Sequence, residues 1–160
     1  MRTVNGLICC LLSALIFYGC STPAHQPTTY RQNRVSAEEL NRLLAEAGKG
    51  DMESQFKLGK IHINGDGVPI NYKEAFNWYE KAALQGHADA QFSLGLMYDK
   101  GHIGIPKNNE RAYVWYKLSS EQGLEDAKKN FTSIENLMTT SEIERANRNL
   151  TKLRNRISKQ

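Results

Sequence analysis

The fold is decided by residues 55–90, QFKLGKIHINGDGVPINYKEAFNWYEKAALQGHADA, because the segment after them repeats their pattern. Residues 91–127 read QFSLGLMYDKGHIGIPKNNERAYVWYKLSSEQGLEDA. Matched positions lie 36 residues apart before an internal loop and 37 apart after it, so the loop has gained one residue. A period of this size predicts a solenoid of helical units. The matched pairs are Gln55/Gln91, Leu58/Leu94, Gly59/Gly95, Gly67/Gly104, Pro69/Pro106, Asn71/Asn108, Ala75/Ala112, Trp78/Trp115, Tyr79/Tyr116 and Gly86/Gly123.

Each unit is predicted to contain two helices. Helix A of the first unit spans about residues 52–63, with Asp51 as its N-cap. Helix B begins at Asn71, an N-cap that forms a capping box with Glu74. Gly86 stands where a left-handed C-cap is expected. An apolar stripe at helical spacing then predicts an amphipathic helix B, and its members are Ala75, Trp78, Tyr79, Ala82 and Ala83.

Two glycines and two tryptophans indicate how the units pack. Gly59 and Gly95 fall inside helices, where glycine costs about 1 kcal/mol relative to alanine. Their recurrence predicts a close approach of helices A and B. We expect Trp78 and Trp115 to be buried against the neighbouring helix pair.

Further helices are predicted on both sides of the repeats. Ser36 and Glu39 form a capping box before a helix over about residues 37–47, and residues 126–138 resemble a degenerate third helix A. Ser141 and Glu144 are predicted to begin a last helix. Its apolar residues are spaced as a seam that packs on another helix, and they are Ile143, Ala146, Leu150, Leu153 and Ile157.

The N-terminus has the pattern of a secretory signal peptide. Arg2 is the only charge before residue 31, and the apolar run over residues 7–17 is too short for a bilayer core, which needs roughly 20 residues. We predict a signal peptide over residues 1–19 and a flexible tether over residues 20–35, which is polar and contains Pro23 and Pro27. The three cysteines are Cys9, Cys10 and Cys20, so none remains in the predicted solenoid.

The net charge of +4 is concentrated in the last helix. Residues 141–160 hold six Lys/Arg and two Glu, whereas residues 20–140 hold 14 Lys/Arg and 15 Asp/Glu. A near-neutral body on an exported chain argues against a nucleic-acid partner. The basic helix is interpreted as a solvated cap, with contact to anionic lipid or an acidic partner as the alternative.

The repeated motifs resemble those of Sel-1-like repeats. The resemblance lies in LGxxY at residues 94–98, in the loop ending G-V/I-P, and in A-x-x-W-Y at residues 75–79 and 112–116. His62 replaces the motif tyrosine in the first unit. The resemblance implies an all-α fold, a right-handed α/α solenoid related to tetratricopeptide arrays, over residues 36–160. We expect repeats at about 51–87 and 88–124, an N-terminal capping helix and a C-terminal cap over 125–158.

The segment FYGC at residues 17–20 resembles a bacterial lipobox. This resemblance implies acylation of Cys20, with palmitate among the expected lipids. Ser21 after the cysteine implies the outer membrane of a Gram-negative envelope, facing the periplasm. Cleavage elsewhere by the ordinary signal peptidase is the alternative.

Several residues fit catalytic or ligand-binding patterns only in part. Ser54 and Lys57 fit the S-x-x-K motif of β-lactamases, but neither SDN nor KTG occurs in the chain. The four histidines lack metal-site spacing, so we expect no metal, cofactor or small-molecule substrate. The loop NGDGVP at residues 64–69 has a copy at residues 100–106 without its aspartate, so it is interpreted as a turn.

The predicted site is instead a concave surface formed by the A helices. Two phenylalanines among charges are typical of an interaction hot spot, although packing between adjacent A helices is an equal alternative. The residues on this face are Glu53, Phe56, Lys60, Ile63, Asp89, Phe92, Leu96 and Asp99.

Together these features predict a non-enzymatic protein-binding scaffold, lipid-anchored in the bacterial periplasm. An immunity or adaptor lipoprotein is the narrower expectation. The alternatives are a β-lactamase-like envelope enzyme and a peptidoglycan-binding or envelope-maintenance protein.

Overall fold

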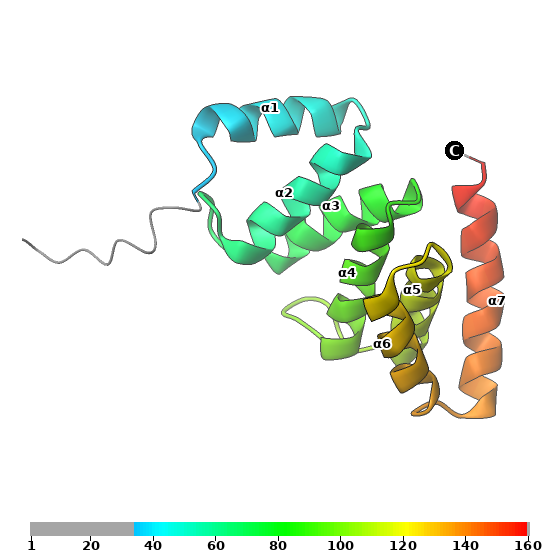
Figure 1. The fold of residues 1–160 in the computed structure, drawn as a ribbon. Coiled ribbons are helices and arrows are strands. Elements are labelled where there is room, and N and C mark those ends of the chain that lie inside the picture. The colour runs from blue at the N-terminus through cyan, green and yellow to red at the C-terminus, as the bar shows by residue number, and fades with distance from the viewer. Residues whose placement is uncertain (1–33, 160) are drawn as a thin grey trace, which may run out of the picture. The chain divides into compact units, whose positions relative to one another are not determined.

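The computed structural model describes residues 34–159, and within them the chain forms α-helices and no β-strand (Figure 1). One isolated antiparallel bridge joins His102 and Ile105 in the loop after the fourth helix. The predicted all-α class is therefore confirmed. The helices are α1 (Ala37–Gly48), α2 (Met52–Asn64), α3 (Tyr72–Leu84), α4 (Ala88–Lys100), α5 (Asn109–Glu121), α6 (Glu125–Glu135) and α7 (Thr140–Ile157).

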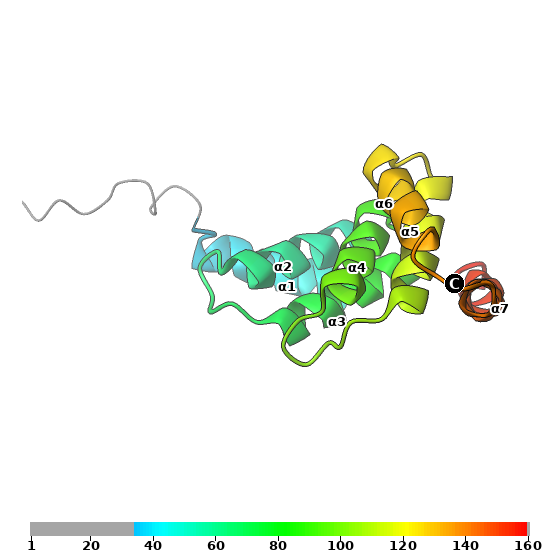
Figure 2. The same cartoon turned by 90° about the horizontal axis from the view of Figure 1, so that it is seen from below.

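Consecutive helices pack on one another, as expected for stacked helical units. The tightest pairs are α2 with α3 and α4 with α5, which are the A and B helices of the two repeats. Helix α7 departs from this order because it packs mainly on α5 (Figure 2). Among the described residues, no helix is long and apolar enough to cross a bilayer.

Polar caps begin most of the helices at the predicted positions. Asp51 Oδ1 accepts a hydrogen bond from Ser54 N at 2.7 Å, and Asn71 Oδ1 accepts one from Glu74 N at 3.1 Å. Asn71 is therefore confirmed as an N-cap, but the reciprocal bond from Glu74 that defines a capping box is absent. The backbone N–H of Asn71 donates to His62 O at 2.9 Å, so it is not available to the Glu74 carboxylate.

Ser36 is confirmed as the N-cap of α1, because its Oγ accepts a hydrogen bond from Glu39 N at 3.1 Å, but the full capping boxes predicted at Ser36 and Ser141 do not form. Glu39 binds Arg42 with both carboxylate oxygens, at 2.7 and 2.9 Å, instead of returning to the backbone of Ser36. Before α7, the capping box is formed by Thr139 and Glu142. The sequence offers two overlapping boxes there, and the earlier one adds two helical residues and their backbone hydrogen bonds.

Most of the core is shared by both repeats. Alanines of the B helices are fully buried, including Ala75, Ala82 and Ala112, and Tyr116 is buried with them. Trp115 is buried as predicted, but Trp78 is only partly buried, packed against a smaller cluster near α1. The other apolar members of that cluster are Leu43, Ala47, Leu58 and Ile61. Helix α7 packs mainly on α5, the helix that carries Trp115.

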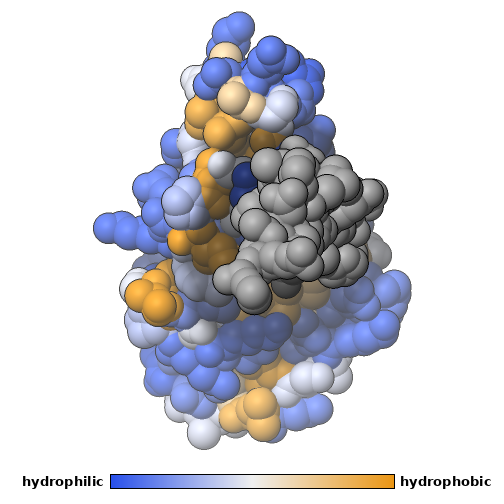
Figure 3. Space-filling model, turned by 90° about the vertical axis from the view of Figure 1, so that its left-hand side faces the viewer, coloured by the Kyte–Doolittle hydropathy of each residue, from blue (hydrophilic) through white to orange (hydrophobic). Residues whose placement is uncertain are grey.

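The α1 end of the described structure exposes scattered apolar side chains. Ile70 and Ile103 are 56% and 86% exposed in the two loops that follow α2 and α4. Figure 3 views this end and shows apolar patches separated by polar ones. Isolated exposed apolar residues are ordinary on protein surfaces, so these carry no functional assignment.

Candidate interaction surfaces

The residues predicted to line the concave face lie on α2 and α4, and we call them the helix A stripe. Glu53, Lys60 and Asp89 are exposed, whereas the other five members are partly buried. The stripe consists of Glu53, Phe56, Lys60, Ile63, Asp89, Phe92, Leu96 and Asp99.

Each phenylalanine of the stripe packs on the tyrosine that ends the A-x-x-W-Y motif of its own repeat and remains partly accessible. We call these two residues, Tyr79 and Tyr116, the repeat tyrosines. The Phe56 ring lies 5.7 Å from that of Tyr79, and the Phe92 ring lies 5.8 Å from that of Tyr116. Phe56 also contacts the His87 ring at 4.5 Å. Both phenylalanines therefore support the scaffold and still present part of their rings at the surface.

His87 links the two repeats along this stripe. It is the N-cap of α4, because its Nδ1 accepts a hydrogen bond from Ala90 N at 3.3 Å. Its Nε2 lies 3.1 Å from Glu53 Oε2, so Nε2 carries the proton and donates. This hydrogen bond lowers the pKa of the Glu53 carboxyl. Sequence reasoning missed His87, although its place between Gly86 and a helix start was a signal.

The remaining apolar and acidic members of the stripe are engaged in the fold. Ile63 and Leu96 pack against the core. Asp99 accepts a hydrogen bond from the Tyr116 hydroxyl at 3.3 Å and lies 3.9 Å from Lys107 Nζ. The accessible part of the stripe is therefore narrower than the eight predicted residues, and its exposed charged residues are Glu53, Lys60 and Asp89.

The helix glycines are explained by the tyrosines beneath the stripe. A Cβ atom on Gly59 would lie 2.4 Å from Tyr79 Cδ1, and one on Gly95 would lie 2.4 Å from Tyr116 Cδ1. The predicted close approach of helices A and B is confirmed. Burial raises the pKa of Tyr79 to about 12 and also raises the pKa of Tyr116, where the Asp99 carboxylate adds to the effect.

In each repeat, a buried glutamine is hydrogen-bonded to the end of the preceding helix and to a second, exposed glutamine. Gln91 Nε2 donates to Ala83 O at 3.1 Å, and Gln91 Oε1 accepts from Gln122 Nε2 at 2.8 Å. Gln55 repeats the arrangement with Ala47 O at 3.1 Å and Gln85 at 2.8 Å. The recurrence of glutamine in both copies has this structural reason, which sequence reasoning left unassigned.

The loop NGDGVP turns the chain between α2 and α3. Gly65 and Gly67 have φ values of 76° and 88°, in the left-handed region, and Asn64 Nδ2 donates to Asp66 Oδ2 at 3.1 Å. A Cβ atom on Gly67 would lie 2.8 Å from Val35 O. Both glycines are therefore used by the backbone, as the interpretation of a turn predicted.

The S-x-x-K residues do not form a nucleophile and base. Ser54 is buried, and its hydroxyl donates to Glu46 Oε2 at 2.9 Å. Lys57 Nζ lies 3.5 Å from Glu53 on the exposed side of α2. Residues 34–159 contain no cluster of three potential metal ligands, and His62 Nδ1 is buried without a hydrogen-bond partner. Cys20 and His25 lie outside the described residues.

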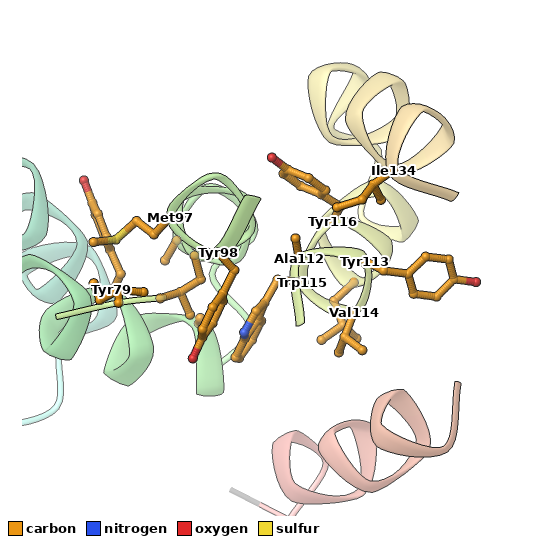
Figure 4. Close-up of a cluster of buried hydrophobic side chains, with 14 of the residues drawn as sticks. Tyr79, Met97, Tyr98, Ala112, Tyr113, Val114, Trp115, Tyr116 and Ile134 are labelled. Atoms are coloured by element: carbon orange, nitrogen blue, oxygen red, sulfur yellow. The ribbon is translucent and has the colours of Figure 1, made fainter. Parts of the chain in front are cut away.

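A second surface lies on the side of the helices opposite the repeat tyrosines. In Figure 4 the hydroxyls of Tyr79 and Tyr116 point toward one side, whereas the rings of Tyr98 and Trp115 point toward the other. Two pockets open on this second side, with volumes of about 360 and 390 Å³. Tyr98 and Arg111 line both, so we call the pair of pockets the Tyr98–Arg111 groove.

These features define the protein as an α-helical repeat protein of the tetratricopeptide-like type, built from two consecutive helix pairs with further helices on both sides. Comparison with protein families gives the particular kind: residues 53–87 and residues 88–124 each match the Sel1 repeat. The chain therefore carries two Sel1 repeats in a helical repeat fold, as the resemblance implied.

Known proteins are similar to parts of this chain. Chitin synthase regulatory factor 4 of Schizosaccharomyces pombe is 38% identical over 56 residues, which is 34% of this chain and 9% of that protein. A protective antigen of uropathogenic Escherichia coli with the SLR fold aligns at 32% identity and a TM-score of 0.60, over 76% of this chain and 25% of the antigen. A Sel1 repeat protein from Oxalobacter formigenes aligns at 34% identity and a TM-score of 0.56, over 64% of this chain and 40% of that structure. The chain thus spans less than half the length of each of these relatives.

Proposed function

We propose that this protein is a non-enzymatic scaffold that binds another protein through the helix A stripe. Sel1 repeat proteins typically mediate protein–protein interaction or regulation. The observation that carries the proposal is the combination of two partly accessible phenylalanines with exposed Glu53, Lys60 and Asp89 on consecutive A helices. Aromatic rings rimmed by charge provide both the buried area and the orientation that interfaces need.

Crosslinking in intact cells followed by mass spectrometry tests the stripe. The informative variants are Lys60→Glu and Asp89→Lys, because both side chains are exposed and neither contributes buried packing. Lys49→Glu, on the exposed C-cap of α1, is the matched control. We expect the stripe variants to lose a crosslinked partner that the control retains. A partner retained by all three variants would refute the stripe as the binding surface.

The proposed cellular setting is the bacterial envelope, with the protein anchored by lipid on Cys20 at the outer membrane and facing the periplasm. The support is the apolar run over residues 7–17 followed by FYGC. Labelling with a palmitate analogue is expected to mark the wild type and not Cys20→Ser. A labelled Cys20→Ser protein, or an unlabelled wild type that still reaches the periplasm, would contradict the anchor.

An immunity or adaptor role is the narrower form of this proposal. It predicts that the crosslinked partner is a protein, whereas a peptidoglycan-binding role predicts retention on purified sacculi. An envelope enzyme of the β-lactamase type is disfavoured because the Ser54 hydroxyl is buried and bound to Glu46. Hydrolysis of a chromogenic β-lactam that disappears in Ser54→Ala would restore that alternative.

A further inference from the structure

We propose that the Tyr98–Arg111 groove is a second binding site, which takes an extended peptide segment with a carboxylate between apolar residues. This site lies on the side of the helices away from the helix A stripe, so it goes beyond the proposed function. The repeats would then act on two ligands at once, one on each side.

Arg111 is held at the boundary of the two pockets by a neutral partner. Its Nη1 donates to the Tyr98 hydroxyl at 2.8 Å, and its guanidinium carbon lies 5.2 Å from the centre of the Tyr98 ring. Tyr98 is in turn fixed by an edge-to-face contact with Phe76, with ring centres 5.5 Å apart. The guanidinium is thus held in a fixed orientation, and most of its N–H donors stay available to another acceptor. A carboxylate matches the planar arrangement of these donors best, because it can accept two parallel hydrogen bonds.

The charge around the groove favours an acidic ligand. Lys73, Lys152 and Arg156 line it together with Arg111, and across residues 34–159 none of these four is ion-paired with a carboxylate. Two carboxylates also line the groove, Glu80 and Glu110. Glu110 already binds Arg145 at 2.8 Å, so the cations exceed the acceptors left for them.

Apolar residues form part of the lining of both pockets, which favours a ligand with side chains over a simple anion. Beside Tyr98, one lining contains Val114, Trp115 and Leu153, and the other contains Phe76, Ile105 and Pro106. Exposed amides stand at the rim, with Asn149 at the first pocket and Asn77 at the second. Amides provide a donor and an acceptor for a peptide backbone. An extended segment would place one apolar side chain in each pocket and its carboxylate on Arg111.

The repeat itself does not require this chemistry. Arg111 occupies the same repeat position as Glu74, 37 residues earlier, and Tyr98 the same position as His62, 36 residues earlier. The first unit folds into the same helix pair with an acidic side chain in place of the arginine. Tyr98 is the tyrosine of the LGxxY motif, whereas Arg111 is found only in the second unit, so the arginine is the residue that the repeat does not require.

The test is selection of a random peptide library, displayed on phage, against the purified full chain and against its Arg111→Gln variant. We expect the wild type to enrich peptides with Asp or Glu between apolar residues, and Arg111→Gln to bind them about tenfold or more weakly. Arg148→Gln is the matched control, because it removes an equal charge from α7 outside either pocket. Circular dichroism checks that all variants fold.

Synthetic versions of the selected peptides separate the sources of the carboxylate. Replacing Asp or Glu by its amide is expected to weaken binding, whereas amidating the C-terminus is expected to leave it unchanged. The reverse result would overturn the recognition of a carboxylate between apolar residues. Equal enrichment on wild type and Arg111→Gln, peptides without carboxylates, or equal losses in Arg148→Gln and Arg111→Gln would each overturn the groove. Peptides lost in Lys60→Glu but retained in Arg111→Gln would overturn the groove and support the helix A stripe.

Discussion

The ring of Tyr79 lies so close to the backbone of Gly59 that a Cβ atom on the glycine would sit 2.4 Å from Tyr79 Cδ1. The same relation recurs between Tyr116 and Gly95 in the second repeat. Each repeat tyrosine therefore reaches across its own hairpin only because the facing residue has no side chain. The contact sets how closely the A and B helices pack, and through them the position of the helix A stripe.

Gly59→Ala is expected to lower the free energy of unfolding by about 1–3 kcal/mol, because the buried ring must shift to admit the methyl group. Alanine's higher helix propensity, worth about 1 kcal/mol, offsets only part of that cost. Gly48→Ala at the end of α1 is the control, since nothing lies within 4 Å of its added Cβ. Urea unfolding measures the free energy of unfolding of both variants. If Gly59→Ala is as stable as Gly48→Ala, the Tyr79 ring moves aside without cost.

Gln91→Met is expected to destabilise the protein by about 0.5–1.5 kcal/mol, because the volume is nearly kept while the Ala83 carbonyl loses one of its two donors and retains Gly86 N–H. Gln122→Met removes only the more exposed partner and should cost less. A double-mutant cycle by thermal unfolding gives the coupling between the two side chains. Additive effects would mean that their 2.8 Å hydrogen bond contributes nothing to stability.

Leu150→Ala on α7 is expected to cost about 2–5 kcal/mol, because this side chain is buried in the core shared with α5. Leu137→Ala, at a position 72% exposed, should change stability by less than about 0.5 kcal/mol. Calorimetry compares the two. An unchanged main transition in Leu150→Ala would indicate that α7 unfolds separately from the repeats.

Stability should fall in alkaline solution because burial raises the pKa of Tyr79 to about 12, above the ordinary tyrosine value near 10. The unfolded chain then loses its phenol proton first, so the stabilisation is complete below about pH 10 and disappears as the pH rises toward 12. The shift corresponds to roughly 2–3 kcal/mol. Tyr79→Phe removes this pH dependence, so between pH 10 and 12 the wild type should lose roughly 2–3 kcal/mol of unfolding free energy relative to the variant in urea unfolding. Parallel pH profiles would contradict the assignment.

Much of the architecture was predictable because its causes are local. Asp51 and Asn71 are N-caps of the helices that begin directly after them. Gly65 and Gly86 adopt positive φ values in the turns that follow the helices. The two helix glycines were predictable for a related reason. A costly residue kept at the same place in two copies implies a packing requirement, and the tyrosine rings supply it.

The interaction surfaces were less predictable. Sequence spacing placed the helix A stripe on one side of α2 and α4, but it did not show that Asp99 is bound by Tyr116 or that His87 pairs with Glu53. The Tyr98–Arg111 groove was missed altogether. Its two defining residues lie 13 positions apart on different helices, and no motif connects them.

The sequence by itself determined that this is an all-α repeat protein, because a duplicated pattern of apolar positions, caps and glycines permits only stacked helix pairs. Tertiary structure alone decided where α7 lies. Its apolar seam could pack on any apolar helix surface. In the folded protein Ala146 and Leu150 join the core that includes α5. Two ion pairs, Arg145 with Glu110 and Arg154 with Glu121, also hold α7 against α5. Those partners are 33 to 35 residues apart, so only the folded chain brings them together.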